Sequence, residues 1–418
     1  MAVFDNLNKT TSAGVATAVA EYYDRALLKN VMPELVHCRD LQKRPLPPHN
    51  GRRVQFRRFT PFGAVTTPLT EGVTPAGQEL TQTALYATVK PYGAHVEITD
   101  EMNFFLLDNI HRETVKLLSD QAALSLDSIA RDALCAGMNV QFPKDTITAR
   151  SQITAEDKLT YDMIKKAVRF LKKNNCKPFP DGFYHAVISV DAVHDLTGDA
   201  MWTDVSKYQD KQKTEKYELG TIYKVKFFES PNAKVFRAQT YLYGQKQSLA
   251  VSAWDAASRL LTVSDALTED DCRKLIGMLV DVSCAQSGSA GVQTVCIEDA
   301  RPYVDDKHPA TLLLRWTPGE TATENWGADG YTTTIVPTGG GTGGIDVHAT
   351  LIYGENAAGA VELGGYGRNV ETIIMPPGSG GASDPLKQRG TVAWKVKGFA
   401  ATILQDSWII RLEHAVSA

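Results

Sequence analysis

The residues of this chain with the greatest capacity for metal or acid–base chemistry lie close together near the middle of the sequence. Asp191, His194 and Asp195 fall within five residues, and His185 precedes them. Carboxylates and imidazoles are zinc ligands, but protein zinc sites repeat fixed ligand spacings that are absent here. We therefore interpret these four residues as structural rather than as a metal site, and we expect no metal and no cofactor.

Other arrangements that carry catalysis are also missing from the sequence. The glycine runs Gly339–Gly344 and Gly378–Gly381 lack the Lys-Ser/Thr pair and the following helix of a phosphate loop. No Gly-x-Ser-x-Gly elbow occurs, and the cysteines and histidines form no recognisable pair of nucleophile and base. The six cysteines lie at least twelve residues apart, at Cys38, Cys135, Cys176, Cys272, Cys284 and Cys296. This spacing indicates reduced thiols rather than a disulfide framework or a zinc ribbon, and we expect no enzymatic activity.

Length and composition indicate a globular protein of two or three domains. The chain has 418 residues, of which 43% are hydrophobic, enough for real cores. No run of eighteen apolar residues occurs, and Met1–Thr17 lacks the basic region and apolar block of a secretion signal, so neither membrane nor export is indicated. The net charge of −4 argues against a protein that wraps nucleic acid by bulk electrostatics.

One basic cluster stands out against this acidic balance. Arg52, Arg53, Arg57 and Arg58 fall within seven residues of a strand-like run. They are suited to contact phosphates or the carboxylates of an adjacent subunit, and we favour the second. The alternative is a solvated strand face, because exposed charges on a strand also prevent edge-to-edge pairing.

The cluster begins a segment that has nothing of its own to pack against. Two strand-like runs, Val54–Phe59 and Ala84–Ile98, are rich in β-branched and aromatic residues. Between them, Thr60–Thr81 contains three prolines and three glycines that exclude a helix or a central strand. A connection of about twenty residues without its own core usually marks a binding loop or a disordered linker. Because only Glu71 and Glu79 are charged in it, we interpret it as an arm that becomes ordered on a neighbouring chain.

The clearest helix follows this arm and covers Asp108–Ala136, with Asp108 as its cap and Gly137 as its stop. Apolar residues at three- and four-residue steps place one stripe against a core, while Asp127 and Arg131 point elsewhere. At 1.5 Å per residue this helix would be roughly 40 Å long, which indicates a structural role. The following segment reads as α/β, with a basic-faced helix over Thr160–Lys173, a buried strand over Phe183–Val190, a helix from Asp191 to Leu196 and a strand over Ile222–Phe228.

Three separated blocks in this chain resemble the major capsid proteins of tailed bacteriophages. The first block comprises Asp195, Leu196, Asp199, Trp202, Tyr208, Leu219, Gly220, Thr221, Ile222, Tyr223, Val225, Phe227, Glu229 and Ser230. The second comprises the run Thr67–Pro75 with Thr88, Val89, Tyr92, Gly93, Val96, Glu97, Ile98 and Asp100. The third comprises Gly378, Ser379, Gly381, Ser383, Asp384, Pro385, Leu386, Gln388, Arg389, Thr391, Val392 and Trp394. Their common order makes the resemblance far more specific than one short motif, and it covers residues 1–237 and 345–418.

The resemblance implies an α+β chain with the Hong Kong 97-type capsid fold, which has a long spine helix, peripheral and axial domains, an extended β-hairpin loop and, in this chain, an inserted α+β domain. By that likeness residues 1–49 form an N-terminal arm, 50–99 the extended loop, 100–150 with 385–418 the peripheral domain, and 151–237 with 345–384 the axial domain. In that family the extended loop lies across the neighbouring subunit.

Residues 238–344 depart from the family pattern and are expected to form an inserted surface domain. This stretch has 13 Asp and Glu against 7 Lys and Arg, a net charge of −6. Thr268, Glu269, Asp270 and Asp271 resemble a capping box that opens a helix through Leu279. Strands are expected at Thr311–Trp316 and Tyr331–Val336. The glycines of Pro337–Gly344 are expected to form a flexible connection back to the rest of the capsid fold. We expect this domain on the outer capsid surface, because an acidic inner face would repel a genome.

The resemblance implies a structural protein that self-assembles into hexamers and pentamers of an icosahedral head enclosing double-stranded DNA, formed in the host cytoplasm and retained in the virion. Scaffold or decoration proteins are candidate partners, and packaged DNA would make only weak, non-specific contact. The expected contact residues between subunits are Arg52, Arg53, Arg57, Arg58, Leu69, Glu71 and Val73. Two alternatives stay open, namely a soluble module that uses 238–344 to bind host material or glycans and, less favoured, a genome-packaging enzyme.

Overall fold

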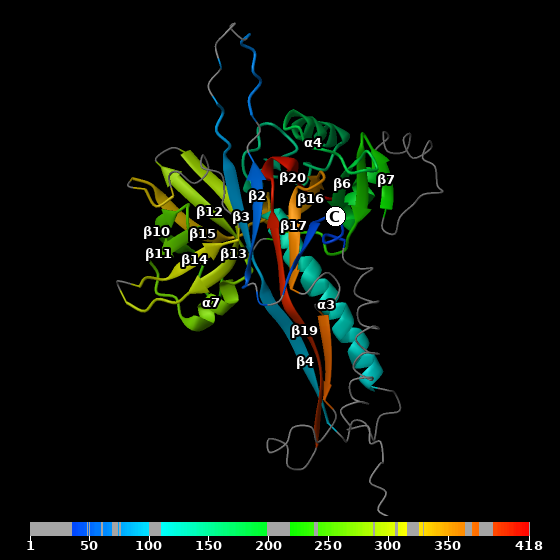
Figure 1. Ribbon diagram of the computed structural model, residues 1–418, viewed down its shortest axis with the longest axis vertical. Helices are drawn as coiled ribbons and strands as arrows, with labels where there is room; N and C mark the ends of the chain where they lie inside the picture. The colour runs from blue at the N-terminus through cyan, green and yellow to red at the C-terminus, as the bar shows by residue number, and fades with distance from the viewer. Residues whose placement is uncertain are drawn as a thin grey trace, which may run out of the picture.

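A computed structural model describes residues 36–47, 49, 51–59, 62–68, 74, 77–99, 110–198, 218–237, 241–286, 289–305, 308–315, 326–328, 330–363, 370–375 and 388–417. These residues form two open sheets, a closed barrel, a two-stranded hairpin and a small set of helices (Figure 1). No helix among them is long and apolar enough to cross a membrane.

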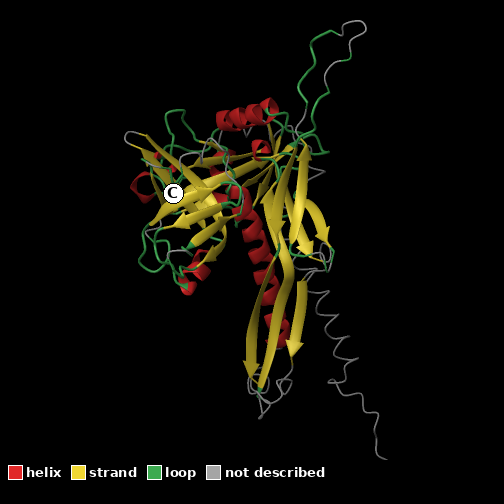
Figure 2. Cartoon of the chain, turned by 60° about the vertical axis from the view of Figure 1, so that its left-hand side comes forward, coloured by secondary structure: helices red, strands yellow, loops and turns green. Residues whose placement is uncertain are grey.

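The first sheet is long and narrow and lies beside the longest helix. In this sheet β1 (Gln42–Leu46) pairs with β17 (Ala358–Leu363), and β17 pairs with β19 (Arg389–Ile403). Strands β18 (Val370–Met375) and β4 (Lys90–Thr99) also pair with β19. Helix α3 (Ile110–Cys135) packs along it, and Trp394 Nε1 donates to Gln121 Oε1 at 3.0 Å between the two (Figure 2). The predicted long helix is confirmed over Ile110–Cys135, whereas its predicted cap, Asp108, lies outside the described residues.

The second sheet is buried on both faces. Its order is β5 (Val140–Gln141), β20 (Ile409–His414), β16 (Val347–Tyr353), β6 (Tyr184–Ile188), β8 (Val225–Glu229) and β7 (Glu218–Ile222), with β9 (Val235–Phe236) beside β16. Helices α4 (Tyr161–Lys173) and α5 (Val190–Thr197) bury their apolar faces in the same core as this sheet. Short 3-10 turns occur at η2 (Arg150–Gln152), η4 (Thr342–Gly344) and η6 (Asp406–Trp408).

The barrel has its own apolar interior and closes on itself, so it leaves no free sheet edge. Its strand order is β10 (Leu249–Asp255), β11 (Leu260–Val263), β14 (Thr311–Leu314), β13 (Ser289–Arg301), β12 (Leu279–Gln286) and β15 (Thr332–Pro337). Helix α7 (Glu269–Leu275) begins at the predicted capping box, in which Thr268 and Asp271 exchange hydrogen bonds. All these elements lie inside the range 238–344.

Several predicted boundaries are wrong, each for a physical reason. Ala84–Ile98 is two strands, because β3 (Gln82–Thr88) pairs with β2 (Arg53–Phe59) and β4 pairs with β19. Ile222–Phe228 is a hairpin whose turn residues, Tyr223 and Lys224, have φ of 43° and 65°.

Two further expectations fail around the barrel. Helix α7 stops at Leu275 rather than Leu279, because Gly277 adopts φ of 83° and Leu279 enters β12. The predicted flexible return is an ordered turn: Thr342 N–H donates to the Ile153 carbonyl at 2.8 Å, and a Cβ on Gly341 would lie 2.6 Å from that oxygen. Glycine is needed there for close approach rather than for flexibility.

Candidate assembly surface

The antiparallel pair β2 and β3, with the loop between them, forms a structure that we call the hairpin arm (residues 53–88). The strands pair in register from Arg53 opposite Thr88 to Phe59 opposite Gln82. The arm forms a sheet separate from the others, and its loop projects beyond the body of the molecule (Figures 1 and 2). The alternation of β2 explains its attachment, because Phe56 points inward and only 4% of it is exposed.

One face at the base of the arm is fixed by a small apolar cluster. Phe56 and Ala87 pack there with Leu46 of β1, Val361 of β17 and Leu404. The Val89 N–H donates to the Arg52 carbonyl at 2.9 Å and closes the pairing before the chain turns into β4. Lys90 then reaches the barrel, where its ammonium contacts the carbonyl of Glu298 and lies 3.6 Å from the Asp299 carboxylate. The base of the arm is therefore held on two sides.

The four predicted arginines lie on or beside the arm and all are exposed. Arg53 lies over the ring of Tyr86, with 4.4 Å from its guanidinium carbon to the ring centroid, a cation–π contact. Among the residues that the structure describes, no carboxylate forms an ion pair with Arg52, Arg53, Arg57 or Arg58. The other three predicted contact residues, Leu69, Glu71 and Val73, lie outside the described residues.

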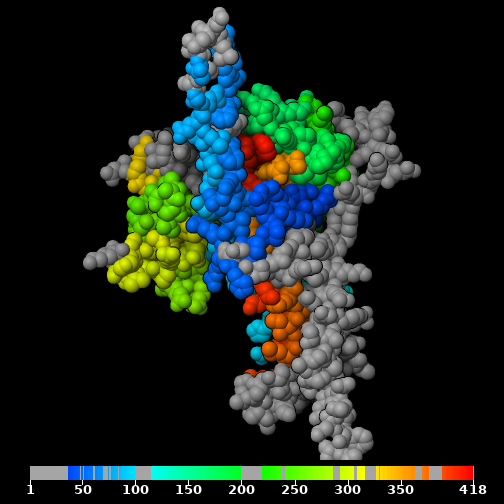
Figure 3. Space-filling view, in the orientation of Figure 1, coloured from blue at the N-terminus to red at the C-terminus, as the bar shows by residue number. Residues whose placement is uncertain are grey.

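Large apolar side chains are exposed on the same arm. The exposed fractions are 54% for Phe59, 55% for Phe62, 72% for Val65 and 60% for Leu80. Figure 3 shows the arm and its loop standing out from the molecular surface, with the barrel beside the base. Exposed apolar side chains that gather on one projecting element are typical of a protein–protein contact.

A buried ion cluster fixes the barrel to the second sheet. The guanidinium of Arg150 donates to both carboxylate oxygens of Glu413 at 2.8 and 2.7 Å. It also donates to the Asp281 carboxylate and the Thr294 hydroxyl of the barrel, each at 2.9 Å. Arg411 donates to Glu413 at 2.8 Å, so two cations face two carboxylates. We call Arg150, Asp281, Thr294, Arg411 and Glu413 the barrel junction.

Burial and charge act against each other in the barrel junction. Desolvation alone would raise the pKa of Glu413, but Arg150 and Arg411 hold that pKa below its usual value. Arg150 is 9% exposed, and its guanidinium carbon lies 3.6 Å from the ring centroid of Phe236. All its polar contacts are therefore internal, and the barrel is held in one orientation.

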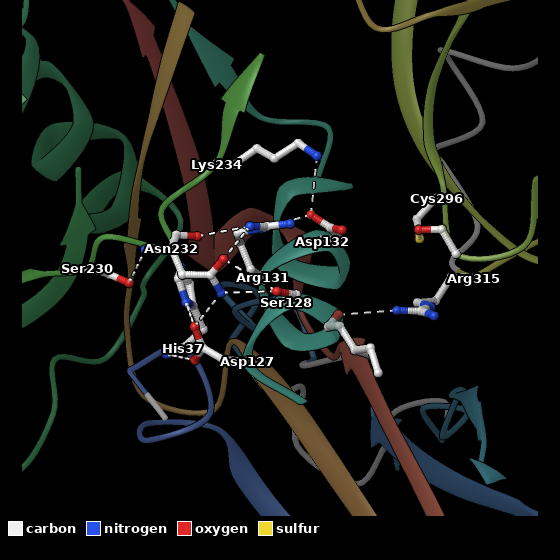
Figure 4. Close-up of polar contacts among 12 residues, drawn as sticks. His37, Asp127, Ser128, Arg131, Asp132, Ser230, Asn232, Lys234, Cys296 and Arg315 are labelled. Atoms are coloured by element: carbon white, nitrogen blue, oxygen red, sulfur yellow. Dashed lines mark hydrogen bonds and ion pairs between the residues drawn. The ribbon is translucent and has the colours of Figure 1, made fainter. Parts of the chain in front are cut away.

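A second polar network joins distant segments to the middle of α3. The Asn232 side chain donates to Asp127 at 2.9 Å and accepts from Arg131 at 2.7 Å, as Figure 4 shows. His37 donates its backbone N–H to Asp127 at 2.8 Å, and its ring Nδ1 lies 2.7 Å from the same carboxylate. Desolvation would raise the pKa of Asp127, but the hydrogen bonds and charge of His37 together with the hydrogen bond from Asn232 outweigh it, and the pKa is lowered. Asp127 does not face solvent, since it is 2% exposed.

The barrel also contacts this part of α3. Arg315, which follows β14, donates to the carbonyl of Ile129 at 3.2 Å. Outside the barrel, Lys234 lies 3.4 Å from Asp132 of the same helix (Figure 4). This network was not predicted from the sequence, because its members lie about a hundred positions or more apart and none belongs to a recognisable motif.

Of the residues first considered for metal chemistry, His185 lies in β6, and the other three lie in α5. His185 lies between Asp40 and Asp181, at 2.8 and 2.9 Å. Asp195 instead accepts hydrogen bonds from Ser417, while the His194 side chain is 85% exposed. No group of three or more His, Cys, Asp or Glu in the described ranges is arranged to hold a metal ion.

Comparison with known proteins addresses the fold. No family model matches the chain, and no curated protein matches it in sequence. Among solved structures, the capsid of Ralstonia phage GP4 is similar with a TM-score of 0.52 and 10% identity, covering 91% of this chain and 88% of that one. The fold is that of a phage capsid protein.

This likeness confirms the expected α+β, Hong Kong 97-type capsid fold, and it extends over nearly the whole chain. The capsid of cyanophage P-SCSP1u is a further match, with a TM-score of 0.49, 11% identity, and coverage of 90% of this chain and 87% of that one. At 10% identity the likeness to the GP4 capsid concerns the fold alone, so the contact residues must be argued from this chain itself.

Proposed function

We propose that this chain is a major capsid protein, which self-assembles into hexamers and pentamers of an icosahedral phage head enclosing double-stranded DNA. It would act in the virion as a structural protein rather than as an enzyme. The observation that carries the proposal is the projecting hairpin arm, whose exposed arginines form no ion pair with a described carboxylate and whose large apolar side chains are more than half exposed. The capsid fold supplies the context in which such an arm would lie on a neighbouring copy.

The arm favours a head-to-tail contact between copies. A protein surface that pairs with a different surface of the next copy closes into rings when the rotation between copies is suitable. Obligate interfaces bury on the order of 2,000–5,000 Å². An arm laid over a neighbour would add apolar contact to such an interface and place Arg57 and Arg58 near carboxylates of the next copy.

The division into domains is part of the same proposal. The barrel occupies Leu249–Pro337, inside the range 238–344 that the sequence marks as an insert. The assignments of 1–49 to an N-terminal arm, 50–99 to the extended loop, 100–150 with 385–418 to the peripheral domain and 151–237 with 345–384 to the axial domain stay predictions, as does the outward position of the insert.

The test is assembly of the purified full-length chain, followed by negative-stain imaging and sedimentation. We expect shells of uniform size from the unaltered chain. The double variant Arg57→Glu/Arg58→Glu should remain folded but fail to assemble at physiological salt. The matched control, Arg273→Glu/Lys274→Glu on α7, makes the same change in net charge on exposed residues and should assemble normally.

A second variant replaces residues 62–80 by a short turn and removes the loop without touching Phe56. We expect a folded subunit that forms no shells. Shells from this variant, or a monomeric unaltered chain at every concentration, would contradict the proposal.

A further inference from the structure

Helix α4 carries a basic surface that the assembly proposal does not use. Its apolar residues are buried against the second sheet, whereas Lys165, Arg169, Lys172 and Lys173 on the opposite side are exposed. Within Tyr161–Lys173 there are five basic residues and one acidic residue, in a chain whose net charge is −4. Positive charge is therefore concentrated on this helix.

The exposed cations are not neutralised by the described part of the chain. Lys166 is paired with Asp145 at 3.1 Å and lies 3.7 Å from Asp162. In contrast, no described carboxylate forms an ion pair with Lys165, Arg169 or Lys172. Like charges three and four positions apart on a helix destabilise it by about 0.2–0.5 kcal/mol per pair. Attraction to the negative C-terminal end of the helix favours Lys172, but it does not reach Lys165, which lies in the N-terminal half.

Two tyrosines are interleaved with these cations. The rings of Tyr161 and Tyr223 meet edge to face, with centroids 6.2 Å apart. Lys165 lies 5.6 Å from the ring centroid of Tyr161, and Lys172 lies 5.6 Å from that of Tyr223. Tyr223 is 44% exposed and is held in the left-handed region at φ of 43°, which is costly for a bulky residue. We call Lys165, Arg169, Lys172, Tyr161 and Tyr223 the α4 basic surface.

We propose that the α4 basic surface binds the phosphate backbone of double-stranded DNA. This inference rests on the proposed function, because a head protein that encloses DNA meets that polyanion over one whole face. Lys165 and Lys172 are seven residues apart, roughly 10 Å along the helix axis, a length over which duplex DNA presents several phosphates. The exposed charged side chains project from one helix, which suits contact with a phosphate backbone rather than readout of bases.

An acidic protein is the competing partner. The dependence of binding on salt, together with the position of the α4 basic surface in the particle, distinguishes DNA from such a protein. Neutralising about three phosphates gives a slope of log K against log salt of about −3. Binding by one subunit would be weak and independent of sequence, and repetition over a shell would make it effective.

The first experiment measures binding of the full-length chain to a labelled mixed-sequence DNA duplex by fluorescence anisotropy at increasing salt. The double variant Arg169→Glu/Lys172→Glu should lose roughly tenfold or more of the affinity at low salt. The control Arg273→Glu/Lys274→Glu, with the same change in charge, should bind as the unaltered chain does. Equal affinities of the two variants, or no DNA binding by the unaltered chain, would overturn the proposal.

The second experiment locates the surface in particles. Amine-reactive labelling should modify Lys165 and Lys172 in emptied shells and spare them in DNA-filled ones. Equal labelling in both, or recognition of an acidic protein without DNA binding, would overturn the DNA assignment. The α4 variant Arg169→Glu/Lys172→Glu should still form shells. Failure of the unaltered chain to assemble would therefore refute the proposed function, whereas normal shells of the α4 variant with unaltered DNA binding would refute only the role of α4.

Discussion

The barrel junction and the hairpin arm both depend on arginine, but they place it in opposite environments. Arg150 is 9% exposed and donates four hydrogen bonds to side chains from β12, β13 and β20. Arg57 and Arg58 are exposed and form no ion pair with any carboxylate of the described residues. Arginine therefore joins elements of one subunit in the barrel junction, whereas in the hairpin arm it presents an exposed positive charge.

The difference follows from the cost of burying charge. A buried guanidinium must find its counter-charges and hydrogen-bond acceptors inside its own chain, because water cannot reach it. An exposed guanidinium is already solvated, so its pairing can wait for another molecule. The barrel junction thus holds the barrel rigidly within one subunit, while the hairpin arm remains available to a second one.

The largest effect is expected from breaking the barrel junction. Arg150→Met removes the shared partner of Glu413 and Asp281 and leaves both carboxylates buried, which should lower the free energy of unfolding by about 3–5 kcal/mol. Urea unfolding followed by fluorescence measures this loss. The matched variant Arg57→Met should change stability by less than about 0.5 kcal/mol. Equal losses in the two variants would remove the contrast between the regions.

The two phenylalanines of β2 test the same contrast with apolar side chains. Phe56 is 4% exposed and packs on Val361, whereas Phe59, three residues along the strand, is 54% exposed. Phe56→Ala should cost about 3 kcal/mol through the cavity that it leaves, and Phe59→Ala should cost almost nothing in the isolated subunit. Phe59→Ala should instead weaken assembly. A marked loss of subunit stability from Phe59→Ala would mean that this side chain packs within its own chain.

Acid should act on the neighbourhood of the barrel junction and not on the hairpin arm. Burial lowers the pKa of His414 to about 4, and its ring accepts from Thr350 at 3.0 Å in the neutral form. Burial also lowers the pKa of the neighbouring His348. In the unfolded chain this histidine has its usual pKa of 6.5, so the stability that is present above that pH is lost as pH falls toward 4. For His414 this amounts to about 2 kcal/mol by pH 5.

A variant comparison isolates this effect, because Asp406 works in the opposite direction. Burial raises the pKa of Asp406 to about 6, so its contribution to stability grows as pH falls through the same range. Unfolding of His414→Gln and of the unaltered chain should therefore be compared at pH 7 and pH 5. We expect the variant to lose less stability on acidification, and equal losses would show that His414 is not held neutral.

Local features of the fold were predictable from the sequence, since their signals are local. The spacing of apolar residues predicted helix α3, and Thr160 and Thr268 mark the starts of α4 and α7. The hairpin arm was recognisable because prolines and glycines between two strand-like runs exclude regular structure. Its arginines are exposed, as a contact with another subunit and a solvated strand face both require, and the contact stays a prediction.

The barrel junction was not predictable, because its signal is distributed. Arg150 lies 263 residues from Glu413 and 131 from Asp281, and nothing in the sequence around it marks it as buried. The turn at Tyr223 was missed for a related reason: two non-glycine residues with positive φ are not a usual hairpin signal. The contacts that fix elements to one another depend on the completed fold, whereas the elements themselves do not.

The smallest effect is expected from single truncations on the arm, and it tests the comparison most directly. Arg52→Ala, Arg57→Ala and Arg58→Ala should each change the unfolding free energy of the subunit by less than about 0.5 kcal/mol, because each side chain is already solvated. Arg53→Ala should cost slightly more, since it also removes the contact with Tyr86. The same variants should raise the protein concentration needed for assembly, and more so at low salt, where unscreened charges attract most strongly. If a truncation lowered subunit stability and left assembly unchanged, that arginine would belong with Arg150 as an internal contact.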